Sequence, residues 1–97
     1  MKGEELHSFL IHNQGDDVAV AVRDVADGTD GVAVAMDTGT DVTITTRNPI
    51  PLGHKVALRD LPEGSEVRKY GIRIGTTTVA VVVGDHVHTH NLKSARW

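Results

Sequence analysis

The chain has 97 residues, of which 39% are hydrophobic and only 3% aromatic, and its formal net charge is −3. This length predicts a single domain over residues 1–97 with a modest core, and the negative charge gives no reason to expect nucleic acid as a partner. The absence of cysteine excludes disulfides and thiolate ligands, and no apolar run approaches the roughly 20 residues of a membrane span, so no membrane partner is expected.

The first residues, Met1 to His7, are polar and predict a flexible tail. They lack the apolar region of a signal peptide, so we expect a cytoplasmic protein. Valine-rich segments follow, separated by turns of Gly, Asp and Asn, which is typical of strands. Pro49 and Pro51 mark residues 47–53 as a connector, since proline removes hydrogen-bond donors from a sheet. The segments predicted as strands before that connector are residues 8–12, 17–22, 32–36 and 42–46.

No segment repeats apolar residues at helical spacing over enough length to predict a helix. At most, one turn of helix is expected at residues 24–27 and another at residues 61–64. Many short strands at a spacing of roughly 8–12 residues are typical of a small barrel or a sandwich-like fold. The sequence therefore predicts an all-β domain.

Residues 20–28 and 56–64 resemble each other at an offset of 36 residues. Both copies place an Arg-Asp pair at the end of a strand, followed by an apolar residue and a turn that ends in an acidic residue and Gly. Two copies are too few for a solenoid, so we expect two similar halves of one β domain. The Arg-Asp pairs, at residues 23–24 and 59–60, are typical of strand-end capping and of exposed ion pairs.

Residues 50–92 hold four of the six histidines, and three of these fall at alternate positions. If that segment is extended, His86, His88 and His90 project from one side of it, which indicates a metal site. Along a straight strand, however, residues i and i+4 lie about 13 Å apart, whereas a metal–imidazole bond is about 2.1 Å long. At most two of the three would then bind one ion, unless the strand bends. Partly exposed polar residues at a strand end are the alternative.

His54 and Lys55 follow Gly53 at the start of a further predicted strand. A lysine ammonium suits a sugar-acid carboxylate, so His54 and Lys55 are candidates for substrate binding. Because consecutive strand residues face opposite sides, only one of the two is expected to join a given pocket. Of the remaining histidines, His54 is expected to approach the three-histidine segment most closely. A solvated lysine is the alternative for Lys55, and Tyr70 is more typical of a core edge than of a catalyst.

From about Ile11 to Lys93 the chain resembles the amino-terminal domain of the altronate and galactarate dehydratase family. The motifs occur in the family's order: HNQGDDVAVAVRDV, IPLGHKVALRDLPEG, KYGIRIG and GDHVHTHN. The triple-histidine ending is closer to the altronate branch. A small separate subunit of sulfolactate sulfo-lyase is similar too. The resemblance implies an SAF-type β-clip, a small all-β domain with short strands and long loops.

In that family a larger catalytic domain follows this one, so the resemblance implies a small subunit or amino-terminal domain of a hydroxy-acid lyase, altronate dehydratase-like. The implied partners are a larger lyase chain and a sugar-acid or sulfo-hydroxy-acid substrate, and assembly with further copies of the same chain stays open. The expected cofactor is a divalent metal, Fe, Mn or Zn, held by His86, His88 and His90. The chain alone is expected to be inactive. A non-catalytic module for sugar-acid binding or assembly is the alternative.

Overall fold

The computed structural model describes residues 7–94, and within this range the chain forms nine strands and no helix. Consequently, these residues include no helical segment long and apolar enough to cross a membrane. Of the predicted tail at residues 1–7, all but His7 lies outside the described residues. The strands are β1 (Phe9–Ile11), β2 (Val18–Ala21), β3 (Asp30–Ala35), β4 (Asp41–Thr45), β5 (Lys55–Ala57), β6 (Glu66–Lys69), β7 (Ile72–Thr77), β8 (His86–Val87) and β9 (Leu92–Ser94).

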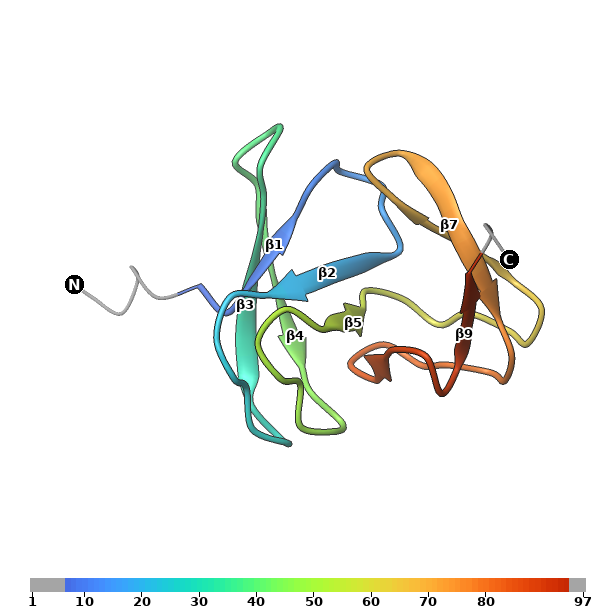
Figure 1. The fold of residues 1–97 in the computed structure, drawn as a ribbon. Helices are drawn as coiled ribbons and strands as arrows, with labels where there is room; N and C mark the ends of the chain where they lie inside the picture. The colour runs from blue at the N-terminus through green and yellow to red at the C-terminus, as the bar shows by residue number, and fades with distance from the viewer. Residues whose placement is uncertain (1–6, 95–97) are drawn as a thin grey trace.

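The strands form two sheets, with the order β4-β3-β1-β2-β5-β8 in the larger and β6-β7-β9 in the smaller. β1 and β3 run parallel, and the other paired strands run antiparallel. In Figure 1, β3 and β4 lie at one end of the molecule, β7 and β9 lie at the other, and β5 lies between them. The predicted all-β class is confirmed, and the four strands predicted before the connector are confirmed within two residues at each end.

Neither of the two helical turns considered from the sequence forms. Instead, Val25 makes an isolated antiparallel bridge with Ile50, and Leu61 makes one with Val81. All four side chains are buried. Pairing the extended backbone at these points satisfies its hydrogen bonds while the apolar side chains enter the core.

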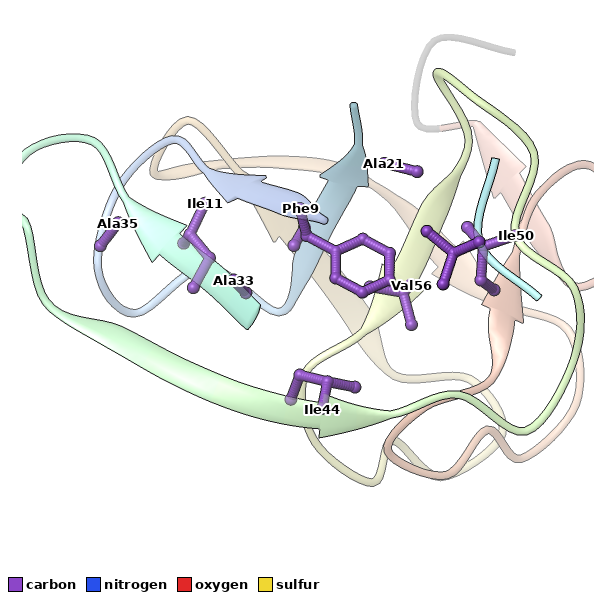
Figure 2. Packing of buried hydrophobic residues seen from close by; sticks show 10 residues of the cluster. Phe9, Ile11, Ala21, Ala33, Ala35, Ile44, Ile50 and Val56 are labelled. Carbon is purple, nitrogen blue, oxygen red and sulfur yellow. The ribbon is translucent and has the colours of Figure 1, made fainter. Parts of the chain in front are cut away.

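The larger core cluster surrounds Phe9, which is fully buried on β1 (Figure 2). Gly31 of β3 makes room for its ring, because a Cβ at that position would lie 2.8 Å from the ring. Burial in this cluster otherwise comes from aliphatic side chains, as the aromatic-poor composition predicts. The other members are Ile11, Ala19, Ala21, Val25, Ala33, Ala35, Ile44, Ile50 and Val56.

A second core cluster joins the smaller sheet to β5 and β8. Val67 of β6 and Val87 of β8 are fully buried there, and Ile74 of β7 and Leu92 of β9 pack against the cluster from the smaller sheet. Burial of these side chains fixes the smaller sheet beside the edge of the larger one. The remaining members are Val18, Ala57, Leu61 and Val81.

In the first copy of the sequence repeat, a buried threonine closes the turn. The hydroxyl of Thr46 donates to the carbonyl of Ala26 at 2.7 Å and accepts the N–H of Thr29 at 2.9 Å. The N–H of Gly28 donates to the carbonyl of Thr46 at 2.9 Å. Thr46 is thus bonded through both its side chain and its backbone to the turn that ends the repeat.

The second copy uses the same contacts. The hydroxyl of Thr77 donates to the carbonyl of Pro62 at 2.6 Å and accepts the N–H of Ser65 at 2.9 Å. The N–H of Gly64 donates to the carbonyl of Thr77 at 2.9 Å. The expectation of two similar halves is therefore confirmed, down to individual hydrogen bonds.

The aspartates of the two Arg-Asp pairs also act alike. Asp24 accepts the N–H of Leu52 at 2.8 Å, and Asp60 accepts the N–H of Val83 at 2.9 Å. Asp24 thereby holds the loop at Leu52, and Asp60 holds the loop at Val83. Arg59 does not pair with its neighbour in sequence; its guanidinium bonds to the buried carboxylate of Asp17.

Two adjacent buried carboxylates hold the hairpin formed by β6 and β7. Asp16 accepts the N–H groups of Tyr70 at 2.9 Å and of Gly71 at 3.0 Å, and Asp17 accepts the N–H of Arg68 at 2.7 Å. Tyr70 and Gly71 form the two-residue turn, with φ of 60° and 73°. Positive φ at both positions is what a tight hairpin of this length requires. Aspartate side chains therefore determine where this hairpin lies.

Candidate functional site: a histidine cluster beside a cationic groove

Three histidines meet at the edge of the larger sheet formed by β8. His54 immediately precedes β5, His86 begins β8, and His88 follows it. Nδ1 of His54 lies 2.8 Å from Nε2 of His86, and the rings of His54 and His88 stack with their centroids 3.9 Å apart. One ring nitrogen from each residue lies within 4.8 Å of the other two. We call these three residues the histidine cluster.

His88 joins the cluster because the chain turns after Val87. The side chain of Asn91 closes this turn, donating from Nδ2 to the carbonyl of His86 at 2.8 Å and accepting the N–H of His88 at 2.9 Å. Residues 86–90 are therefore extended only as far as Val87, and the bend that the sequence left open occurs there. The turn also places the ring centroids of His86 and His90 only 5.2 Å apart, far closer than a straight strand would allow.

The structure brings together two of the three predicted metal ligands, His86 and His88. Their third partner is His54, which was predicted as a substrate-binding residue and as the histidine nearest to this segment; that proximity is confirmed. The nitrogens of His90 lie outside the group that could hold one ion. Metal binding itself stays a prediction.

The surroundings of the cluster favour neutral imidazoles. Burial lowers the pKa of His86, and the neighbouring His54, His90, His88 and Lys55 lower it further. Burial also lowers the pKa of His88, with further contributions from His54, Lys55 and His90. A neutral imidazole has a free lone pair, which is the form that binds a metal ion.

The donor set fits a divalent cation. Three imidazole nitrogens leave coordination positions open for substrate or water, and imidazole suits Zn and Fe better than Mn, which prefers oxygen ligands. The close approach of His54 Nδ1 to His86 Nε2 needs a hydrogen between the two nitrogens. The three ring nitrogens lie within 4.8 Å of one another, so the side chains would move closer together to hold an ion with bonds of about 2.1 Å.

A groove of about 590 Å³ runs beside the cluster. His88 belongs to both, Lys55 enters the groove from β5, and Lys69 and Arg73 enter it from the β6–β7 hairpin. We call it the cationic groove, because within the described part of the chain the charged side chains that line it are these two lysines and the arginine, apart from any charge on His88. The other residues that line it are Tyr70, Ile72, Ile74, Thr89, Leu92 and Ser94.

Only Lys55 of the two lines the groove, whereas His54 belongs to the histidine cluster, so the prediction that only one of them would join a given pocket is confirmed. His54 lies before β5, outside the alternation of the strand, whereas Lys55 is its first residue. His88 connects the histidine cluster with the cationic groove, since it stacks on His54 and lines the groove together with Lys55. Lys55 is partly buried, and both burial and the nearby charge of Lys69 lower its pKa.

Tyr70 is not the core-edge residue that was predicted. Its side chain is 55% exposed at the hairpin turn, where its ring stacks on His12 with a centroid separation of 3.9 Å. Lys69 and Arg73, which flank this turn, were missed as site residues. The signal that would have found them is the Tyr-Gly turn itself, because residues on either side of a two-residue turn end up on neighbouring strands.

Comparison with known proteins gives one family. Residues 7–95 match the altronate/galactarate dehydratase SAF domain. The (2R)-sulfolactate sulfo-lyase subunit alpha of Chromohalobacter salexigens is 38% identical over 90 residues, which cover 92% of this chain and 96% of that protein. The subunit of the same name from Paracoccus pantotrophus is 44% identical over 66 residues, which cover 68% of this chain and 98% of that protein.

Altronate dehydratase of Escherichia coli is 42% identical over 79 residues. These residues cover 81% of this chain but only 15% of that enzyme. The chain therefore spans nearly the full length of the two alpha subunits and a small part of the dehydratase.

Proposed function

The chain belongs to the altronate/galactarate dehydratase SAF domain family, and on this premise we propose that it is the small subunit of a metal-dependent lyase for a 2-hydroxy acid. The observation that carries the proposal is the histidine cluster, which offers three ring nitrogens as metal ligands. It lies beside a groove lined by the cationic side chains of Lys55, Lys69 and Arg73. The match to separate lyase alpha subunits over most of their length supports a role as a subunit with a larger partner chain.

The proposed reaction is an elimination. A base removes the proton on the carbon next to the carboxylate, the leaving group departs from the following carbon as water or sulfite, and a carbon–carbon double bond forms between the two carbons. The resulting enol rearranges to a 2-keto acid. Removal of the proton drives negative charge onto the carboxylate, and a divalent cation in the histidine cluster would offset that charge.

The residues of this chain bind and orient rather than transfer the proton. His54, His86 and His88 would hold the cation through their ring nitrogens, and Asn91 holds the turn that brings His88 to the other two. Lys55 contributes an ammonium beside the cluster, where it attracts the substrate carboxylate. We assign the base to the larger chain, which would also close the groove and exclude water from it.

The experiment is an activity assay with purified chains. The chain is assayed alone and together with the larger lyase chain of the same organism, on sulfolactate and altronate, with Fe, Mn or Zn. We expect turnover only from the pair. His88→Gln in the pair should abolish that turnover, whereas His7→Gln, which lies outside the cluster, should preserve it. Robust turnover by the isolated chain would contradict the proposal.

A non-catalytic assembly role is the second candidate, and exposed apolar side chains favour it. Ile72 on the hairpin is 62% exposed, and Leu52 in the connector is 61% exposed. Contiguous apolar surface often marks a contact with another chain, and Ile72 lies with the exposed Tyr70 at the hairpin. If the larger chain is equally active with and without this one, the assembly role is the correct function.

A further inference from the structure

We infer that the cationic groove binds the second anionic group of a doubly charged hydroxy acid, with Lys69 and Arg73 as its ligands. The inference rests on the proposed function, because it names the class of substrate that would act there. The second group is a carboxylate or a sulfonate, and the first is the carboxylate held near Lys55 and the histidine cluster.

The charges of the groove are unbalanced. Lys55 and Lys69 have no ion-pair partner within residues 7–94. Arg73 has one, at 3.7 Å from Glu66, but both side chains are about half exposed, so the pair is weak. Because Lys69 and Lys55 lie close enough to repel each other, an anion between the groove walls would relieve that repulsion.

Every polar side chain of the groove can donate a hydrogen bond, and the three charged ones can only donate. Among residues 7–94, no Asp, Glu, Asn or Gln lines it, and the uncharged polar side chains that do are those of Tyr70, Thr89, Ser94 and neutral His88. A polyhydroxy chain carries many O–H donors, which need acceptors such as carboxylates and amides. An oxyanion needs donors alone. The lining therefore favours a compact acid with two anionic ends over a sugar acid with one.

The groove and the histidine cluster are arranged to share one molecule. His88 belongs to both, and the charge of Lys55 acts on His86 and His88 while its side chain lines the groove. A short acid bound at the cluster through one end can therefore extend along the groove. Its other end would meet the hairpin that carries Lys69 and Arg73.

The hairpin wall is already fixed before any ligand binds. The buried carboxylate of Asp16 accepts the backbone N–H groups of Tyr70 and Gly71, between Lys69 and Arg73 in the chain. Holding the backbone in this way lowers the ordering cost of binding. Lys69 also lies 5.2 Å above the ring of Tyr70, which limits the range of its side chain.

The test is a binding titration of the metal-free full chain, without a partner, at low ionic strength, followed by amide chemical shifts in NMR spectra. Sulfolactate and malate are the doubly charged probes, and gluconate is the singly charged one. We expect the doubly charged acids to bind about fivefold to tenfold more tightly, with the largest shifts at the hairpin. Lys69→Met and Arg73→Met should each remove most of that difference.

Lys93→Met is the matched control, since it removes the same charge from an exposed residue of β9 that does not line the groove. It should leave the preference for the doubly charged acids unchanged. Equal affinity for gluconate and malate, or an equal loss in the Lys93 variant, would overturn the inference. The result is independent of the proposed function, because the titration needs no metal, no partner and no turnover, whereas the lyase assay needs all three.

Discussion

Nδ1 of His54 and Nε2 of His86 lie 2.8 Å apart, although 32 residues separate them in the chain. Antiparallel pairing of β5 with β8 brings them together, with Val56 opposite His86. A pair of imidazoles this close shares one hydrogen, and a third imidazole, that of His88, stacks directly beside them. The cluster is therefore set by the fold and does not depend on a bound ion to assemble it.

The first prediction concerns which histidines bind metal. Single changes of His54, His86 or His88 to Gln should each weaken Zn or Fe binding by more than the roughly 10–100-fold that loss of an outer-shell partner costs. His90→Gln should weaken it far less, since its nitrogens lie outside the group. Calorimetric titration of the apo chain measures the affinities. A larger loss for His90→Gln than for His54→Gln would instead support the three-histidine set predicted from the sequence.

The second prediction concerns pH. The folded state lowers the pKa of His86, His88 and His12 from 6.5, in each case chiefly through burial, so the folded chain binds fewer protons than the unfolded chain. The metal-free protein should therefore be fully stable above pH 6.5 and should lose stability as the pH falls below that value. Urea unfolding at several pH values measures this loss.

The control for the pH dependence is a paired change, His86→Gln with His88→Gln, which should flatten the fall in stability. His7→Gln should leave its slope unchanged. If the stability instead rises on acidification from pH 7 to pH 5, the three histidines do not determine its pH dependence.

The third prediction concerns the hairpin. Asp16→Ala should destabilise the protein by about 2–4 kcal/mol, because the backbone N–H groups of Tyr70 and Gly71 both lose the buried carboxylate that accepts from them. Urea unfolding measures this loss of stability. In the variant, hydrogen exchange should accelerate more at the amides of Tyr70 and Gly71 than at those of β6 and β7. Asp27→Ala, an exposed change of the same kind, should cost almost nothing.

The fourth prediction uses the repeat. Thr46→Val and Thr77→Val each remove a buried hydroxyl that donates one hydrogen bond and accepts another. Each change should cost about 1–3 kcal/mol, and the two losses should be similar because the contacts correspond. Thr43→Val, on the exposed face of β4, should be nearly neutral. A large difference between Thr46 and Thr77, measured by thermal unfolding, would show that the two halves are not energetically equivalent.

Local pattern was sufficient to predict the class of fold and the repeat. Alternating valines indicate strands wherever they occur, and the Arg-Asp copies at residues 20–28 and 56–64 show their relation in the sequence itself. The contacts that complete each copy were not predictable in the same way. Thr46 and Thr77 lie far from their repeats in the chain, and only the folded backbone brings them to the turns.

The site was predicted in part for a similar reason. His86 and His88 were found because an alternating pattern is visible in a single segment. His90 was grouped with them because the alternating pattern places all three on one side of an extended segment. The chain instead turns after Val87, and that turn depends on Asn91, whose side chain bonds to the backbone of His86 and of His88. The Tyr-Gly turn is a local signal that Lys69 and Arg73 lie on neighbouring strands. Their place beside the groove depends in addition on the hydrogen bonds that Asp16 accepts from the hairpin turn, which no local pattern shows.

The position of β5 has a consequence for how the molecule is put together. This strand pairs with β2, where Val20 lies opposite Lys55, and on its other edge with β8, where Val56 lies opposite His86. This three-residue strand thus pairs with β2 from the first copy of the repeat on one edge and with β8 on the other. The two halves of the domain therefore share a strand, and neither is complete without the other. His54 and Lys55 stand at the start of that shared strand. A shift in the strand register of either half would displace both residues together.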